Sequence, residues 1–540
     1  MSPVSPASST PTQPKPLGPL AHWPVVTTIP LLAGSIGDAL RRHATARGER
    51  TAILWEGAEG LQRMSYAKLL VKVENLARWL LERAAPGDRV ALWSKNNLES
   101  VVLQHASAMA GTILTPFNTS WTDFEVRHAL DLVQPRVWFV GQDTRGISLL
   151  ERATALVEDR VLVGIDDLLK QQARSQTPLP DVAADAPFLI QFTSGTTGRA
   201  KGAVLSHRAA LNGGYLRPAT DGANDSDVWL NPVPLHHVGG SCSIVLGALS
   251  VGGAYAVMDR HDTDITVRLL QPTGATRIGG VPTMLMDLLN HPQIAAGGFK
   301  HSIRVISVGG ASVPPSLIQR IIRELGATPA IGYGQSECPI ITSTSMHDDV
   351  DTIATTVGRP AFHAEVKIVD PTTRETLKLG EIGEVCVRSQ LIMSGYYGMP
   401  EATAETIDAD GFLHTGDLGS MDSNGIMRIH GRAREVIIRG GENIYPAEVE
   451  DALLRHPAVQ LAAVIGVDDE KWGQQVAAVV QLRPGQQATP EDLRAFAAQR
   501  VAHFKIPRYW HFVSGMPMTA SGKIRKVELE ARFKATGSTS

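Results

Sequence analysis

The chain has 540 residues, of which 43% are hydrophobic and 19% charged, so it is long enough for a full core and for more than one domain. Its 51 Lys and Arg against 54 Asp and Glu leave a net charge of −3, which excludes the basic excess of a dedicated nucleic-acid-binding protein and a polybasic membrane patch. The three cysteines, Cys242, Cys338 and Cys386, fit neither a disulfide framework nor a zinc site, and they indicate a reducing compartment.

Residues 1–20 are rich in proline and serine, and we expect them to form a disordered tail. They lack the basic start and the apolar stretch of a secretory signal, so we expect a cytoplasmic protein. Segment 228–258 contains no Asp, Glu, Lys or Arg, but its prolines and glycines favour buried strand, loop and short helix over a membrane span.

Strands and helices alternate from about residue 21 onwards. Ser35 and Asp38 resemble a capping box at the start of a helix. Apolar patterns further along the chain predict helices at 66–83 and 315–325, and strands at 89–93, 137–140, 304–308 and 330–333. Alternating strands and helices are typical of a layered, mostly parallel α/β fold.

The pattern changes after residue 432, where a short polar stretch is followed by a compact α+β unit. We expect strands at 435–439, 458–467 and 476–482, and helices at 447–455 and 491–502. The sequence therefore predicts a large N-terminal domain at 21–432, with layered sheets and flanking helices, and a small C-terminal domain at 433–540.

An apolar run at 188–192 leads into the ten residues Thr193-Ser-Gly-Thr-Thr-Gly-Arg-Ala-Lys-Gly202. Hydroxyl groups and glycines let backbone N–H groups approach an anion, and Lys201 adds a positive charge. The pattern is not a Walker A loop, because Ala200 precedes the lysine. We predict a phosphate-binding loop whose candidate residues are Thr193, Ser194, Gly195, Thr196, Thr197, Gly198 and Lys201.

This loop resembles that of the adenylate-forming enzymes: acyl- and aryl-CoA synthetases, peptide-synthetase adenylation domains and firefly luciferase. Further motifs in family order extend the resemblance from about residue 35 to residue 530. It implies that ATP activates a carboxylate as an acyl-adenylate, and that the acyl group is then passed on. ATP, Mg²⁺ and coenzyme A are the implied cofactors, in an ATP- and acyl-binding N-terminal domain and a mobile, catalytic C-terminal domain.

Gly332-Tyr-Gly-Gln-Ser-Glu337 resembles the family's Tyr-Gly-x-Thr-Glu motif, with serine replacing threonine. The resemblance implies that Tyr333, beside Gly334, stacks on adenine, that Ser336 contacts phosphate and that Glu337 holds Mg²⁺. A hard cation on triphosphate oxygens prefers one or two carboxylates. The segment Gly309, Gly310 and Ala311 resembles the family segment that packs along the adenine and acyl groups.

Thr415-Gly-Asp417 matches the family's ribose-binding motif, and Gly431-Arg432 follows fifteen residues later. Asp417 can accept hydrogen bonds from a diol, and Arg432 can donate to ribose or phosphate oxygens. Ile429, close to this arginine, completes the candidate nucleotide-binding residues.

The C-terminal domain carries three motifs of the family. Arg434 occupies the hinge position, where Asp or Lys is usual. Gly440, Gly441 and Glu442 begin a segment, ending at Pro446, that resembles the loop lining the pantetheine tunnel during thioester formation. Lys523, in Pro517-Met-Thr-Ala-Ser-Gly-Lys523, resembles the lysine that bridges the carboxylate and the α-phosphate during adenylation.

The stretch 234–243 holds the expected acyl pocket. It lacks the acidic residue with which amino-acid-activating members hold an ammonium group, so we expect a plain carboxylic acid. His237 matches a family position near the reacting carboxylate, and with Lys523 and Glu337 it makes up the catalytic candidates. Three small residues leave room for a medium or bulky apolar acid: Gly239, Gly240 and Ser241.

Three interpretations follow. The first is a free-standing acyl-CoA ligase, active as a monomer or a homodimer. The second is a ligase that loads the phosphopantetheine of a carrier protein. The third is a catalytically silent nucleotide- or acyl-binding relative, against which Glu337, Asp417, Arg432 and Lys523 argue. A luciferase-like oxygenase side activity is also open.

Overall fold

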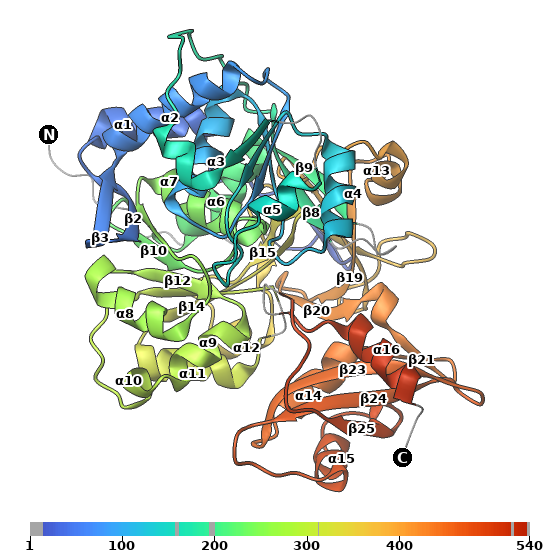
Figure 1. The fold of residues 1–540 in the computed structure, drawn as a ribbon. Helices are drawn as coiled ribbons and strands as arrows, with labels where there is room; N and C mark the ends of the chain where they lie inside the picture. The colour runs from blue at the N-terminus through green and yellow to red at the C-terminus, as the bar shows by residue number, and fades with distance from the viewer. Residues whose placement is uncertain (1–14, 157–160, 194–199, 311–312, 520–522, 537–540) are drawn as a thin grey trace, which may run out of the picture.

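The computed structural model describes residues 15–156, 161–193, 200–310, 313–519 and 523–536. They form a large N-terminal body with three sheets and a smaller C-terminal body with one sheet, which is drawn in orange and red (Figure 1). Some of the sequence-based expectations lie outside the described residues: most of the N-terminal tail, Ala311, and Ser194, Gly195, Thr196, Thr197 and Gly198 of the phosphate loop.

The largest sheet has nine strands in the order β16-β15-β14-β13-β12-β10-β11-β2-β3. The strands from β14 to β2 are parallel, and a hairpin at each end adds antiparallel strands. In chain order they are β2 (Thr51–Gly57), β3 (Gly60–Ser65), β10 (Val228–Asn231), β11 (Ala254–Val257), β12 (Arg277–Gly280), β13 (Val305–Val308), β14 (Thr328–Gln335), β15 (Cys338–Ser343) and β16 (Arg359–Pro360).

A second sheet has six strands in the order β7-β6-β4-β5-β8-β9. All are parallel except β9, which forms a hairpin with β8. In chain order they are β4 (Arg89–Trp93), β5 (Ile113–Pro116), β6 (Val137–Val140), β7 (Val161–Gly164), β8 (Pro187–Thr193) and β9 (Lys201–Ser206).

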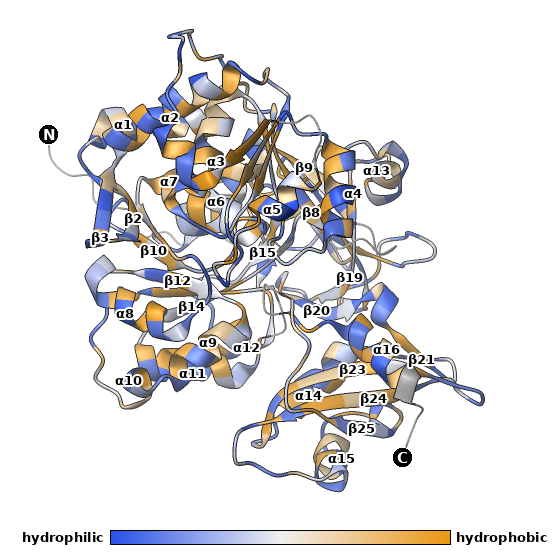
Figure 2. Ribbon diagram, viewed as in Figure 1, coloured by the Kyte–Doolittle hydropathy of each residue, from blue (hydrophilic) through white to orange (hydrophobic). Residues whose placement is uncertain are grey.

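Helices pack on both faces of these sheets, which therefore consist of apolar strands (Figure 2). In β4, Val90 and Leu92 face the core shared with the nine-stranded sheet, while Ala91 and Trp93 face the opposite side. The shared core holds α1 (Ile36–Arg47), α2 (Tyr66–Leu81), α3 (Leu98–Ala110), α6 (His207–Thr220), the π-helix η2 (Gly239–Leu246) and α7 (Gly247–Val251).

The outer faces of the two sheets are covered by the remaining helices of the large body. On the six-stranded sheet these are α4 (Asp123–Val133) and α5 (Leu150–Thr154), and η1 (Ile165–Lys170) follows β7. On the nine-stranded sheet they are α8 (Thr263–Thr273), α9 (Pro282–Asn290), α10 (Pro292–Ala295), α11 (Pro315–Leu325) and α12 (Val350–Thr355).

The third sheet is antiparallel, in the order β1-β17-β18-β19-β20. Its strands are β1 (His22–Trp23), β17 (Ala364–Val369), β18 (Gly383–Ser389), β19 (Leu413–Met421) and β20 (Met427–Arg432), and α13 (Pro400–Thr406) lies between β18 and β19 in the chain. Because β20 ends at Arg432, this sheet brings the chain to the start of the C-terminal body.

The C-terminal sheet has the order β22-β21-β24-β23, with β25 paired to β24. Helices α14 and α15 pack on one face of it and α16 on the other. The elements are η3 (Ala433–Glu435), β21 (Ile437–Arg439), β22 (Glu442–Ile444), α14 (Pro446–Leu454), β23 (Val459–Asp469), β24 (Gly473–Leu482), α15 (Pro490–Ala498), η4 (His503–Lys505), β25 (Tyr509–Phe512) and α16 (Lys526–Thr536).

The structure confirms the predicted layered α/β fold with a smaller C-terminal domain. Ser35 and Asp38 form a reciprocal capping box, and the strands at 89–93 and 137–140 have the expected bounds. The strand expected at 435–439 begins later, because Glu435 belongs to a 3₁₀ turn and bonds Lys526. The exact boundary between the domains at residue 432 remains a prediction.

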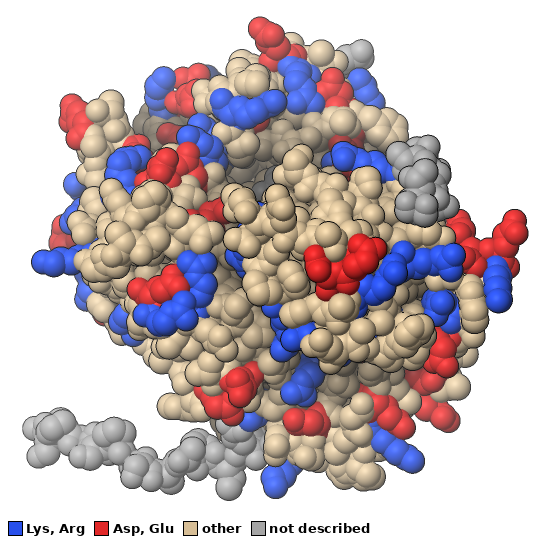
Figure 3. Space-filling model, turned by 90° about the horizontal axis from the view of Figure 1, so that it is seen from below, with Lys and Arg blue, Asp and Glu red and all other residues tan. Residues whose placement is uncertain are grey.

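The segment at 228–258 folds as β10, η2, α7 and β11, as expected from its composition. Among the described residues, no helix combines the length and the apolar character that crossing a membrane requires. Cys242, Cys338 and Cys386 are all buried and free. Lys and Arg are interspersed with Asp and Glu on the face seen in Figure 3, in keeping with the near-neutral composition.

Candidate functional site

The two ends of the predicted phosphate loop lie side by side. Thr193 closes β8 and pairs with Lys201 at the start of β9. The Nζ atom of Lys201 lies 4.8 Å from the centroid of the Tyr396 ring. This cation–π contact directs the lysine towards the segment that follows β18.

Glu337 lies in the turn between β14 and β15 and is buried. Tyr396 donates a hydrogen bond of 2.7 Å to its Oε1, and the backbone N–H of Met393 donates to its carbonyl, also at 2.7 Å. Among the described residues, Oε2 has no hydrogen-bond partner. The carboxylate is therefore held on one side and open on the other, which suits a cation ligand. Ser336 precedes it in the same turn and is half-buried.

Tyr333 and Asp417 come from different sheets and meet through a hydrogen bond of 2.7 Å from the tyrosine hydroxyl to Oδ2. The Nε of Arg432 lies 3.3 Å from Oδ1 of the same carboxylate. Burial raises the pKa of Asp417, while Arg432 and Tyr333 oppose that shift. Burial, together with Asp417, raises the pKa of Tyr333. The predicted adenine and ribose residues are thus brought together.

Two of the predicted glycines, Gly309 and Gly310, follow β13 and lie close to other parts of the chain. A Cβ on Gly309 would lie 3.1 Å from the carbonyl oxygen of Gly332, and one on Gly310, at a φ of +80°, would lie 3.4 Å from Cε of Lys523. In β14, a Cβ on Gly334 would lie 2.5 Å from the carbonyl oxygen of Pro339. Each glycine therefore permits a close approach of neighbouring groups.

Lys523 approaches this site from the C-terminal body. The residue is exposed, and its Cε would lie 3.4 Å from a Cβ on Gly310 of the N-terminal body. Loss of hydration around its ammonium group lowers the pKa of Lys523, and the positive charge of Arg432 lowers it further. The negative charge of Asp417 opposes this shift. The same ammonium charge acts on His237. The lysine therefore meets groups that lie more than 90 residues earlier in the chain.

His236 and His237 lie on the turn before η2, with ring centroids 4.6 Å apart. Burial lowers the pKa of His237 to about 4, with help from Lys523, and lowers that of His236 well below its ordinary value. Both rings are therefore neutral at pH 7. Nε2 of His237 is buried without a hydrogen-bond partner among the described residues, so it is available to a ligand.

The small residues of the expected acyl pocket have different surroundings. A Cβ on Gly240 would lie 2.3 Å from the carbonyl oxygen of Pro234, so this glycine serves close backbone packing rather than pocket volume. Ser241 is fully buried and donates to Oε1 of Gln191 at 3.2 Å. Gly239 is half-buried and would meet only Val233, at 3.6 Å. Of the three, Gly239 has the most space beside it.

The predicted hinge and thioester-loop residues lie apart from Lys523. Arg434 is exposed in η3. Gly440, Gly441 and Glu442 are exposed at the β21–β22 turn, where a Cβ on Gly440 would meet Trp472 of the same domain. Ile429 packs against the core of the N-terminal body from β20. The structure therefore presents Lys523, and not this turn, to the site.

A cavity of about 590 Å³ opens beside His236. Its wall includes three cations, Lys95, Arg145 and Arg260, against one carboxylate, Asp259. Asp259 pairs with Lys95 at 2.9 Å and with Arg260 at 3.1 Å, and Asp143 pairs with Arg145 at 2.8 Å, so each of these cations already has a carboxylate partner. Sequence reasoning missed this cavity, because its residues come from six separate segments.

Sequence reasoning also missed Tyr396, which joins Lys201 to Glu337, and Gln191, which fixes the turn before η2 by donating to the carbonyl of His236. The Gly395-Tyr-Tyr397 segment carries a signal, since two aromatic residues beside a glycine are unusual in a loop. Gln191 could have been found as a polar residue inside the apolar run at 188–192.

Comparisons with known proteins agree with this geometry. The family described as AMP-binding enzyme matches residues 40–397, and the AMP-binding enzyme C-terminal domain matches residues 448–523. Mouse (Mus musculus) mitochondrial medium-chain acyl-CoA ligase ACSF2 is 33% identical, over 97% of this chain and 91% of that protein. The 3-[(3aS,4S,7aS)-7a-methyl-1,5-dioxo-octahydro-1H-inden-4-yl]propanoyl:CoA ligase of Rhodococcus jostii is 34% identical, over 92% of this chain and 98% of that protein.

Solved structures show the same arrangement. ATP-bound MatB from Rhodopseudomonas palustris superposes with a TM-score of 0.83 and 28% identity, over 93% of this chain and 99% of that one. MenE from Bacillus subtilis, in complex with an acyl-adenylate intermediate, gives a TM-score of 0.81 and 26% identity over the same shares of the two chains. The chain therefore belongs to the AMP-binding enzyme family, and it is an ATP- and CoA-using acyl-CoA ligase.

Proposed function

We propose that this enzyme activates a medium-sized or bulky apolar carboxylic acid, with Lys523, Glu337 and His237 at the reacting centre. The observation that carries the proposal is the position of Lys523, which lies close to Gly310, Asp417 and His237 of the N-terminal body. The positive charge of this lysine suits a reaction that joins two anions, the carboxylate of the acid and the α-phosphate of ATP. The lysine comes from a separate domain to a site that holds the proposed ribose-binding carboxylate and a neutral histidine.

In the first half-reaction, a carboxylate oxygen of the acid attacks the α-phosphorus of ATP, and the bond to pyrophosphate breaks. Repulsion between the two anions opposes this step, so positioning and charge neutralisation dominate catalysis. Lys523 supplies a positive charge between the carboxylate and the α-phosphate. Lys201 and the loop before it hold the outer phosphates, and Tyr333 and Asp417 hold adenine and ribose.

Glu337 is the residue that would hold Mg²⁺. Its open Oε2 fits such a ligand, and Tyr396, whose ring also contacts Lys201, fixes the other oxygen. When bound, Mg²⁺ neutralises charge on the triphosphate. Ser336, in the same turn, supplies a hydroxyl for a phosphate oxygen.

In the second half-reaction, the thiol of coenzyme A attacks the acyl carbon, and AMP leaves. The cavity beside His236 suits coenzyme A, because three cations on its wall, Lys95, Arg145 and Arg260, can bind the phosphates of that cofactor. Between the two half-reactions, the C-terminal domain rotates about Arg434, in the polar segment that joins the two bodies. This rotation withdraws Lys523 from the site and brings the Gly440–Glu442 turn in.

The class of acid rests on two observations. The turn at 234–243 offers no carboxylate to an amino acid's ammonium group, and Gly239 leaves room beside Val233. Two relatives are named for a medium-chain acyl group and for a bicyclic propanoyl group, both of which are larger than acetate.

A panel of carboxylic acids tests the proposal. Pyrophosphate release is measured with ATP and Mg²⁺ for each acid, with and without coenzyme A, and the thioester is followed by mass. Release with octanoate or a bulky ring-bearing acid, together with its CoA thioester, is the expected result. Preference for acetate, or for α-amino acids, contradicts the proposed acid. Adenylate without thioester indicates a carrier-protein acceptor, and absence of release and of ATP binding indicates a silent relative.

A further inference from the structure

The ribose-binding segment is a bulge between two strands of the third sheet. Glu384 of β18 lies opposite Leu418 of β19, and Cys386 lies opposite His414. Two steps along β18 thus correspond to four steps along β19, so residues 415–417 project from the ladder. This projection carries Asp417 towards Tyr333 and Arg432.

A bulge loses ladder hydrogen bonds, and side chains replace them here. Glu384 Oε1 accepts the backbone N–H of Gly416 at 3.0 Å, where the glycine has a φ of +70°. The hydroxyl of Thr415 donates to the carbonyl of Val385 at 2.8 Å and accepts the N–H of Asp417 at 3.1 Å. Glu384 therefore holds the backbone N–H of Gly416, the residue just before the ribose-binding Asp417, and Thr415 holds the N–H of Asp417 itself.

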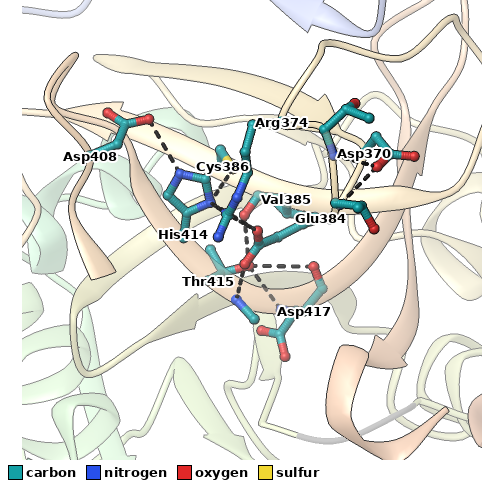
Figure 4. Close-up of polar contacts among 12 residues, drawn as sticks. Asp370, Arg374, Glu384, Val385, Cys386, Asp408, His414, Thr415 and Asp417 are labelled. Atoms are coloured by element: carbon teal, nitrogen blue, oxygen red, sulfur yellow. Dashed lines mark hydrogen bonds and ion pairs between the residues drawn. The ribbon is translucent and has the colours of Figure 1, made fainter. Parts of the chain in front are cut away.

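The second oxygen of Glu384 belongs to a polar network on the other side (Figure 4). Nδ1 of His414 and Nη1 of Arg374 each lie 2.8 Å from Oε2. Nε2 of His414 lies 3.3 Å from Oδ2 of Asp408. Burial alone would raise the pKa of Glu384, but the hydrogen bonds from His414 and Gly416 and the charge of Arg374 lower it. The carboxylate is thus an ionised acceptor held from two directions.

Glu384, Cys386 and His414 also place three potential metal-ligand atoms within 4.8 Å of one another. However, the guanidinium of Arg374 contacts both Glu384 and His414 and already supplies the positive charge. Burial raises the pKa of the Cys386 thiol, and the neighbouring charge of Glu384 adds to this, which disfavours a thiolate ligand. The cluster is therefore better described as an ion-pair network than as a metal site.

We propose that Glu384 is a positioning residue for nucleotide recognition, which holds the 415–417 bulge so that Asp417 faces the ribose diol. The carboxylate of Glu384 is fixed by Arg374 and by His414, which in turn contacts Asp408. Because this carboxylate holds the N–H of Gly416, it sets the position of the next residue, Asp417. This inference rests on the proposed role of Asp417 at the ribose, and it adds a residue that does not touch the nucleotide.

The test compares the affinities for ATP and 2′,3′-dideoxy-ATP by calorimetry, in the presence of Mg²⁺ and without any acid. Wild type should prefer ATP by about 100-fold, the loss expected when the charged Asp417 carboxylate is left without its ribose hydroxyl donors. Glu384→Asp keeps the negative charge for Arg374 and His414 but withdraws the oxygen from Gly416. It should lower this preference about tenfold, as expected for one lost hydrogen bond to a charged group. Glu384→Ala should lower it at least as much.

Glu365→Asp is the matched control. Glu365 lies on β17 of the same sheet and also holds a histidine and an arginine, His22 at 2.8 Å and Arg388 at 2.6 Å. Its carboxylate bonds no residue of the 415–417 bulge, so this variant should keep the wild-type preference whatever it does to the melting temperature. A merely structural role of Glu384 would lower stability in both variants and leave the ATP preference unchanged.

Three outcomes separate the inference from the function on which it rests. If wild type does not prefer ATP, or Asp417→Ala keeps the preference, the ribose role of Asp417 fails. If Asp417→Ala loses the preference while Glu384→Asp retains it, the positioning role of Glu384 is wrong. If the purified protein holds one zinc ion per chain that Cys386→Ser removes, the cluster is a metal site and the ion-pair description is overturned.

Discussion

Tyr396 donates a hydrogen bond of 2.7 Å to Oε1 of Glu337, and the ring of the same tyrosine lies beneath Lys201, whose Nζ is 4.8 Å from its centroid. One side chain therefore links the two charged groups proposed for the triphosphate and its cation. Neither partner is near Tyr396 in the sequence, so the link exists only in the folded chain.

Removing the hydroxyl of Tyr396 should weaken metal binding selectively. In Tyr396→Phe, the ring still supports Lys201, but Glu337 loses a donor and its orientation. We expect the Mg²⁺ concentration for half-maximal pyrophosphate release to rise about fivefold to tenfold, the cost of one hydrogen bond. Tyr397→Phe is the control, because Tyr397 packs against the core beside α4. Equal effects of the two variants would contradict the link.

Loss of Lys523 should separate the half-reactions. In Lys523→Ala, the positive charge between carboxylate and α-phosphate is missing, so adenylate formation should fall by about 100-fold or more. Thioester formation from a supplied acyl-adenylate should stay within about threefold, because the proposed second step uses the Gly440–Glu442 turn. Both rates are measured by single-turnover mass analysis.

The neighbouring Arg525→Ala is the charge-matched control for Lys523→Ala. Arg525 is largely exposed and pairs with Glu528 in the same segment. Equal losses in both half-reactions of Lys523→Ala would overturn the assigned division of labour.

Reversing charge at the cavity should affect coenzyme A alone. Arg260→Glu places a negative charge where phosphates of the cofactor are proposed to lie, so its KM should rise about tenfold while pyrophosphate release without coenzyme A is unchanged. Arg323→Glu, at an exposed position on α11, is the control for net charge. An unchanged KM for coenzyme A in Arg260→Glu would place the cofactor elsewhere.

Two adjacent glycines should respond differently to a side chain. Gly239→Val adds volume beside Val233 and should shift the acid preference towards shorter chains in the carboxylic-acid panel. Gly240→Ala forces a methyl group against the carbonyl of Pro234, so it should lower the melting temperature by several degrees. A shift of acid preference in Gly240→Ala, with Gly239→Val unchanged, would reverse the assignment.

Acid should destabilise the fold through buried neutral histidines. Burial lowers the pKa of His105 from 6.5 to about 4. Because the unfolded chain then binds a proton that the folded chain rejects, stability is lost as the pH falls from 6.5 towards 4. At pH 5 this residue should cost about 2 kcal/mol relative to pH 8. His105→Leu should remove that share of the pH dependence in urea unfolding, whereas the exposed His347→Gln should retain it.

Local chemistry made much of the site predictable. The capping box at Ser35 and the strand at 89–93 are short-range patterns that the folded chain keeps. The resemblance placed Tyr333, Asp417, Arg432 and Lys523 in one nucleotide site, and the structure brings these four together. Such short patterns can be read from the sequence because each depends on residue types at a fixed local spacing.

Contacts between distant segments could not be predicted in this way. Gly240 looked like a source of pocket volume, but the carbonyl of Pro234 fills that space. Tyr396 and Glu384 belong to none of the motifs recognised in the sequence. They gain a role only through their contacts with Glu337 and Gly416, respectively.

The sequence by itself determined the family, the order of the motifs and the two-domain α/β plan, because these depend on residue types at fixed local spacing. Only the tertiary structure decided which side chains hold the motifs in place, which of the small residues faces open space, and which step the C-terminal body is presented for. The physical reason is that strand pairing and domain packing join groups far apart in the chain, and these contacts set distances, burial and charge.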